Sequence, residues 1–145
     1  MEALPSHHIL YPVFAMVALV AFVLNRMRSM RFAAVRSGEI GAGFFRAYEG
    51  EEPEALRVVS RHFTNLFEMP VLFYVAVLMT YVTGQVTLIL VALAWLYVAL
   101  RYAHSFVHLG SNGLIQRFTV YIASAVVLFV MYAALLVQLV LTGGS

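Results

Sequence analysis

Residues 118–141 read FTVYIASAVVLFVMYAALLVQLVL and contain no charged side chain. A helix needs roughly 20 mostly apolar residues to cross the hydrocarbon core of a bilayer. This stretch therefore predicts a membrane-spanning helix, and it is the clearest such segment in the chain.

Three other segments are also apolar enough to span a membrane, namely residues 9–25, 61–82 and 86–107. The turn Thr83-Gly84-Gln85 between the last two predicts an antiparallel hairpin. Helices satisfy all of their backbone polar groups inside lipid. The sequence thus predicts an all-α integral membrane protein, in which four transmembrane helices form a single domain over residues 1–145.

The composition excludes several classes of protein. The chain is 63% hydrophobic and only 11% charged, whereas soluble domains have about 25% charged residues. This excludes a soluble monomeric enzyme and a disordered chain. Without cysteine there is no disulfide and no thiolate metal site. A net charge of +2 is too small to argue for nucleic acid as a partner.

The basic residues are all arginine. Most lie in the polar segment 26–60, and Arg101 and Arg117 flank the connection between the third and fourth spans. The positive-inside rule places both of these connections in the cytoplasm and both termini outside. Arginine without lysine indicates either a need for bidentate grip on anions or a GC-rich genome. A GC-rich genome indicates a bacterium, and therefore favours the bacterial inner membrane as the location. Within the polar segment, Glu51-Glu52-Pro53-Glu54 predicts a helix start.

Ionisable residues inside a span are costly and call for a reason. In the second span, Arg61, Asn65 and Glu68 share one helix face because they are spaced i, i+4 and i+7. One interpretation is an Arg–Glu pair that fixes packing. The other is a polar pocket near the cytoplasmic surface. Pro70 follows within the helix and predicts a kink.

The third and fourth spans add further polar residues at the same membrane level. Arg101, His104 and His108 share one helix face, and Arg117 with Tyr121 begins the fourth span. Three guanidinium groups and one carboxylate that converge would suit a small anionic ligand that carries an amine.

A metal site is the less favoured interpretation. Histidines four residues apart can share an ion, so His104 and His108 could bind one with Glu68 as the third ligand. Five histidines are too few for the histidine-rich di-iron oxygenases. We expect histidines that are hydrogen-bonded between helices, and no bound metal.

The pattern Arg61-x-x-x-Asn65-x-x-Glu68-x-Pro70, with Arg101-x-x-His104 and Arg117-x-x-x-Tyr121 further on, resembles the MAPEG family. These are the membrane-associated proteins in eicosanoid and glutathione metabolism. The resemblance covers nearly the whole chain and is nearest to bacterial members and the microsomal prostaglandin E synthase branch. It implies a homotrimer that binds glutathione in a cytoplasm-facing cleft between subunits.

The resemblance also implies roles for single residues. Arg61, Asn65 and Glu68 would hold the backbone and carboxylates of glutathione, Arg117 would lie near its thiol, and Tyr121 would contact the peptide. Arg101 and His104 are further binding candidates. A guanidinium beside a thiol favours the nucleophilic thiolate, so Arg117 is the first candidate catalytic residue.

Two positions depart from the prostaglandin E synthase-like pattern. Thr64 stands where those members have arginine, and His108 stands where they have tyrosine. A histidine can donate a hydrogen bond to a thiolate or act as a base near neutral pH, so His108 is the second catalytic candidate. The favoured function is a glutathione-dependent transferase or peroxidase that acts on lipophilic electrophiles. The alternative is a non-catalytic lipid- or partner-binding protein, like the family's lipoxygenase-activating member.

Overall fold

The computed structural model describes residues 5–41, 43–47 and 50–142, and these residues form helices without any strand. The helices are η1 (Ser6–Leu10), α1 (Tyr11–Arg36), α2 (Phe44–Ala47), α3 (Glu54–Asn65), α4 (Met69–Val82), α5 (Leu88–Leu109) and α6 (Leu114–Thr142). Four helical segments are long and apolar enough to cross a membrane, and α3 and α4 together form one of them. The predicted all-α membrane fold is confirmed.

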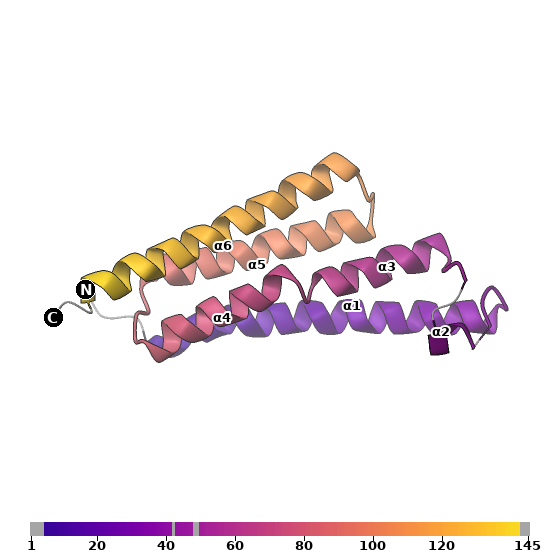
Figure 1. Ribbon diagram of the computed structural model, residues 1–145, viewed down its shortest axis with the longest axis horizontal. Coiled ribbons are helices and arrows are strands. Elements are labelled where there is room, and N and C mark those ends of the chain that lie inside the picture. Colours follow the sequence, from indigo (N-terminus) through magenta and orange to yellow (C-terminus); the bar gives the residue numbers. More distant parts are fainter. Residues whose placement is uncertain (1–4, 42, 48–49, 143–145) are drawn as a thin grey trace.

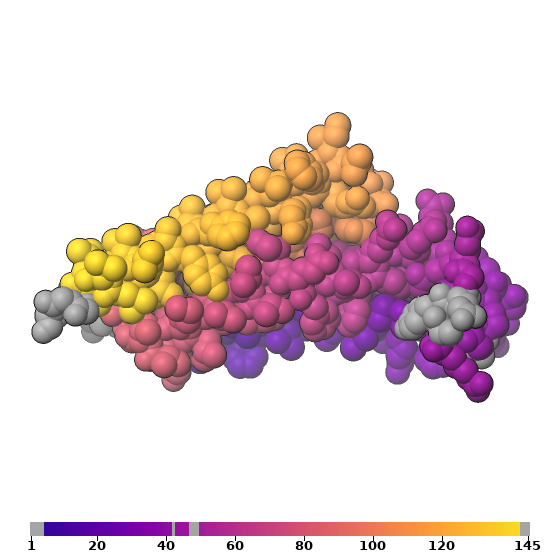
Figure 2. Space-filling view, viewed as in Figure 1, coloured from indigo at the N-terminus to yellow at the C-terminus, as the bar shows by residue number. Residues whose placement is uncertain are grey.

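The four segments run alternately up and down the bundle (Figure 1). Helix α6 packs mainly along α5 and also contacts α4, while α1 packs against α3 and α5. We call the end that holds residues 37–53 and 110–113 the loop end. Toward the loop end, the start of α6 diverges from α3, and the space-filling view shows a notch between them (Figure 2).

The packing of the apolar side chains fits a lipid surround. Buried aromatic rings lie at the centre of the bundle, where Phe73 and Tyr97 stack with their ring centroids 4.6 Å apart. Many large apolar side chains lie on the outside, among them Phe14, Leu78 and Phe129. Such a surface is stable against hydrocarbon and unstable against water. The chain is therefore an integral membrane protein.

The polar segment 26–60 contains more helix than a simple loop. Helix α1 continues to Arg36, where the next turn reaches a positive φ of 77° at Gly38. Arginine side chains tolerate this continuation because their long stems can extend to the membrane surface. Helix α3 begins at Glu54 with Pro53 as its N-cap, so the helix start predicted from the Glu-Pro-Glu pattern is confirmed.

The second span is broken between α3 and α4. Helix α3 ends at Asn65 and α4 begins at Met69 with Pro70 in its first turn. Proline lacks an N–H group, so it cannot donate to the carbonyl of Leu66 as the fourth residue of a continuous helix would. The predicted kink is therefore a full interruption, and Glu68 lies in it.

The predicted hairpin between the second and third spans is also present. Gly84 adopts a positive φ of 68°, and Gln85 donates its backbone N–H to the carbonyl of Thr80. Thr87 caps the start of α5 by accepting a hydrogen bond from Leu90 N–H at 3.4 Å. This short connection holds α4 and α5 antiparallel.

Candidate functional site

A cavity of about 440 Å³ opens near the loop end, between α3, α5 and α6. Seven of the eight residues singled out in the sequence are among those that line it: Arg61, Asn65, Glu68, His104, His108, Arg117 and Tyr121. The eighth, Arg101, is fully buried and hydrogen-bonded to one of them. The fold thus brings together polar side chains from three separate helices.

Asn65 connects a cation and an anion on the α3 side of the cavity. Its side-chain oxygen accepts a hydrogen bond of 2.5 Å from Arg101 Nη2, and its Nδ2 donates to Glu68 Oε2 at 3.3 Å. An amide can serve both partners only in this orientation, because arginine has no acceptor and a carboxylate has no donor. The amide, rather than a direct Arg–Glu pair, links the two charges.

Arg101 is the largest of the fully buried side chains. Besides its bonds to Asn65, its guanidinium lies 5.8 Å from the centre of the Tyr121 ring. Two of its nitrogens, Nε and Nη1, have no hydrogen-bond partner within the described part of the chain. A buried guanidinium with unused donors provides positive charge for an anion held nearby.

Arg117 is held at the α6 side of the cavity by the turn that precedes its helix. Its Nη1 donates to Asn112 Oδ1 at 2.7 Å. Asn112 has a positive φ of 49°, a conformation that asparagine tolerates better than most residues. Asn112, five positions earlier in the chain, thus fixes the orientation of the Arg117 guanidinium.

We call Arg61, Glu68 and Arg117 the open wall of the cavity. Arg61 and Glu68 are exposed and Arg117 is half-buried, so all three can reach a ligand. The wall offers two cations and one anion within one cavity. Such a wall can bind a small molecule that carries carboxylates and an amine.

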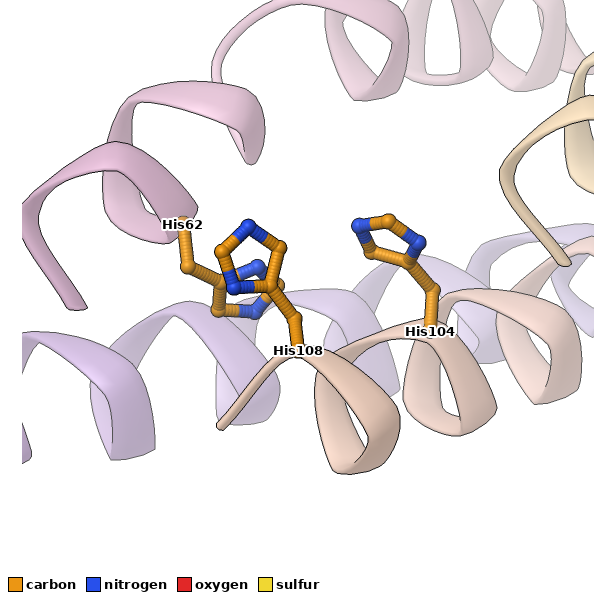
Figure 3. Close-up of side chains that lie close together, drawn as sticks. All are labelled: His62, His104 and His108. Atoms are coloured by element: carbon orange, nitrogen blue, oxygen red, sulfur yellow. The ribbon is translucent and has the colours of Figure 1, made fainter. Parts of the chain in front are cut away.

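Three histidines meet beside the same cavity. We call His62, His104 and His108 the histidine cluster; His62 comes from α3 and the other two from α5 (Figure 3). All three are buried, and one ring nitrogen of each lies within 4.8 Å of one from each of the others. The side chain that the fold groups with His104 and His108 is thus His62, whereas the sequence had suggested Glu68 as a third ligand.

Sequence reasoning missed His62, although one signal was available. An ionisable residue inside a span is itself a candidate functional residue. His62 follows Arg61 by one position, which turns its side chain about 100° from the face of Arg61, Asn65 and Glu68. It therefore lies outside the polar face that the spacing of Arg61, Asn65 and Glu68 predicts.

The MAPEG family model matches residues 9–137, which include every residue of the cavity. The chain belongs to the MAPEG family. No curated protein and no solved structure matches it. The MAPEG family includes glutathione-dependent transferases and related proteins.

This MAPEG chain has a second cavity near the loop end, of about 450 Å³, between α1 and α5. Its lining is almost entirely apolar and includes Leu19, Phe22 and Phe106, with Arg26 among its few polar members. Apolar clefts with few polar groups are typical binding sites for lipophilic ligands. The two cavities lie on different sides of α5 and differ sharply in polarity.

Proposed function

We propose that this MAPEG protein is a glutathione-dependent transferase or peroxidase that acts on lipophilic electrophiles. The observation that carries the proposal is the open wall, which combines two guanidinium groups and a carboxylate in one cavity of about 440 Å³. Glutathione has two carboxylates and one amine, so its charges complement this wall. The cavity lies within the range of volumes typical for small ligands.

We assign the binding roles from the family resemblance and from the positions of these residues in the cavity. Arg61 binds a carboxylate, Glu68 binds the amine, and Asn65 bonds to the peptide while it links Glu68 to Arg101. Tyr121 lines the far side of the cavity and contacts the peptide. The unused donors of Arg101 add positive charge behind this wall.

The reaction begins at the sulfur of glutathione. The guanidinium of Arg117 stabilises the thiolate, which is the nucleophile. His108, which also lines the cavity, donates a hydrogen bond to the sulfur or accepts its proton. In a transferase reaction the thiolate then forms a carbon–sulfur bond with the electrophile. In a substitution the leaving group departs, and in an addition the electron pair of the acceptor's double bond shifts away from the attacked carbon.

The proposal includes a homotrimer in which neighbouring subunits complete the cleft. It also places the loop end in the cytoplasm of a bacterium, with both termini on the opposite side of the inner membrane. The arginine distribution supports this orientation, since Arg61 belongs to α3 and Arg117 to the first turn of α6, and both of these parts lie toward the loop end (Figure 1). Glutathione would then enter from the cytoplasm and the electrophile from the bilayer.

Glutathione binding to the purified protein in detergent tests the proposal directly. A ligand that binds only the folded state raises the melting temperature by mass action. We expect millimolar glutathione to raise it and to change the fluorescence of the single tryptophan, Trp95. Arg61→Ala should weaken both responses, whereas Arg36→Ala, an exposed arginine at the end of α1, should leave them unchanged. If glutathione changes neither the melting temperature nor the fluorescence of the unmodified protein, the proposal is overturned.

A second candidate function is supported by the apolar cavity between α1 and α5. A protein that binds a lipid or a lipophilic compound without turning it over would need this cavity and no thiol chemistry. Two measurements together distinguish the functions. A fluorescent fatty acid that binds with the same affinity whether or not glutathione is present, together with no conjugate of a model electrophile, would favour the second.

A further inference from the structure

The histidine cluster has a chemistry of its own that glutathione binding does not require. His62, His104 and His108 are 0%, 3% and 7% exposed, and one ring nitrogen of each is buried without a hydrogen-bond partner among the described residues. The ring centroids of His62 lie 4.8 Å from His108 and 5.6 Å from His104. Figure 3 shows the three rings gathered in one space between α3 and α5, with one nitrogen of His104 pointing toward the other two rings.

The proton on His62 can be placed from its hydrogen bond. Ser105 Oγ donates to the carbonyl of Arg101 at 2.8 Å, which uses its only hydrogen. The contact of 2.9 Å between His62 Nε2 and Ser105 Oγ therefore requires the histidine to donate. In the neutral ring Nδ1 then carries a lone pair. That Nδ1 is buried and has no hydrogen-bond partner among the described residues.

The same reasoning applies to His104. Its Nδ1 lies 3.2 Å from the carbonyl oxygen of Arg117, which can only accept, so Nδ1 carries the proton. Its Nε2 then carries a lone pair and is likewise buried without a partner in the described part of the chain. His108 adds a third buried ring nitrogen without a hydrogen-bond partner among the described residues, its Nδ1.

Buried polar atoms without partners are rare and call for an explanation such as a bound ion. In metal sites, a histidine ligand almost always donates its other ring N–H to a carbonyl or a side chain, which fixes the tautomer. His62 and His104 already have this arrangement through Ser105 and the Arg117 carbonyl. We propose that His62, His104 and His108 bind one first-row transition-metal ion of the Zn²⁺ type.

The distances allow such an ion after a small movement of the rings. Metal–nitrogen bonds of 2.0–2.1 Å in tetrahedral geometry separate the nitrogens by about 3.3 Å. One ligand nitrogen from each histidine already lies within 4.8 Å of the others, so ring rotations and slight shifts of the helices suffice. Neutral imidazoles suit zinc, copper or nickel and do not suit Mg²⁺ or Ca²⁺, which prefer oxygen ligands.

The site also has an entry path and room for a fourth ligand. His104 and His108 line the cavity that the open wall faces, so an ion can enter from it. Three protein ligands and one open position are typical of catalytic rather than structural zinc sites. Water or an anionic group bound in the cavity can complete the coordination.

Metal titration of the purified full-length chain tests this proposal. After chelator treatment and removal of the chelator, we expect one Zn²⁺ to bind per chain, and Co²⁺ to give the visible spectrum of a four-coordinate ion. His62→Ala should raise the Kd for Zn²⁺ by about 100-fold or more, and Ser105→Ala by about 10- to 100-fold, as expected for a residue that orients a ligand. Mg²⁺ should not compete.

Exposed histidine at the far end of the bundle provides the matched control. His7→Ala removes such a residue from η1 and should leave the Kd unchanged. The absence of saturable Zn²⁺ binding, or an equal loss in the His7 and His62 variants, would overturn the proposal. Should His62→Ala fail to fold, Ser105→Ala still decides, because an unchanged Kd in that variant contradicts the assigned tautomer.

Glutathione binding measured in the same chelator-treated sample separates this inference from the proposed function. Glutathione that binds metal-free protein, with no saturable Zn²⁺ site, removes the metal site and leaves the proposed function intact. Saturable Zn²⁺ binding without glutathione binding supports the metal site and removes the proposed function. The two proposals share His104 and His108 but depend on different measurements.

Discussion

The two sides of the loop-end cavity solve the problem of polar groups in a membrane protein differently. The open wall is accessible, and its charges are oriented by single hydrogen bonds such as that from Arg117 to Asn112. The histidine cluster is buried, and two of its rings, those of His62 and His104, are oriented by Ser105 and a backbone carbonyl. Exposed groups can exchange one ligand for another at little cost, whereas buried ones must keep a partner. The open wall is therefore suited to a substrate and the cluster to a resident group.

The largest effect that this comparison predicts is on the rate of reaction. Arg117→Ala should lower kcat for conjugation of a model electrophile by about 10²- to 10³-fold, the usual loss when one group that stabilises developing negative charge is removed. Much of the glutathione binding should remain, since Arg61 and Glu68 are untouched. A stopped-flow assay with Arg36→Ala as control measures the loss. Full activity in the Arg117 variant would show that this guanidinium does not stabilise the thiolate.

The next largest effect concerns stability and the buried side. In chelator-treated protein, His62→Ala should lower the free energy of unfolding by about 2 kcal/mol, because it leaves a void and deprives Ser105 of a partner. Glu68→Ala, on the open wall, should change it by no more than about 0.5 kcal/mol. Denaturant unfolding in mixed micelles measures both. Equal losses in the two variants would remove the distinction between the buried and the open side.

A smaller effect is expected on affinity. Arg61→Ala should weaken glutathione binding about tenfold, as expected for the loss of one hydrogen bond to a charged group, roughly 1.5 kcal/mol. Titration calorimetry measures it, with Arg36→Ala again as the control. If the affinity were unchanged, the carboxylate would have to bind elsewhere in the cavity.

The smallest predicted effect is a gain. Thr64 lines the cavity one position before Asn65 and is exposed. Thr64→Arg would add a third guanidinium to the open wall, and exposed ion pairs are worth about 0.2–1 kcal/mol. We therefore expect a glutathione Kd lower by up to about fivefold at low salt, and less at high salt. Thr64→Gln is similar in length without the charge and should not tighten binding.

Much of the fold could be predicted from the sequence. Long apolar runs specify membrane-spanning helices because only a helix satisfies its own backbone in lipid, and Gly84 and Pro70 mark the turn and the break by their local backbone properties. The extent of helix in the segment 26–60 was harder to predict. There the helix continues to Arg36 although the composition becomes polar, since arginine has good helix propensity.

The residues of the cavity were also accessible from the sequence, but their contacts were not. Spacing along one helix predicted that Arg61, Asn65 and Glu68 share a face, and all three line the cavity. It could not predict that Asn65 would bond to Arg101 on another helix, because helical periodicity carries no information about the rotation or height of a neighbour.

By itself, the sequence determined the four apolar spans, the level at which polar residues gather and the family to which the chain belongs. Only the tertiary structure decided that His62, which faces away from Arg61 on α3, meets His104 and His108 from α5. The physical reason is that the spans follow from the partition of each segment between water and lipid, which is a local property. The histidine cluster follows from how two helices pack, and that depends on every side chain between them.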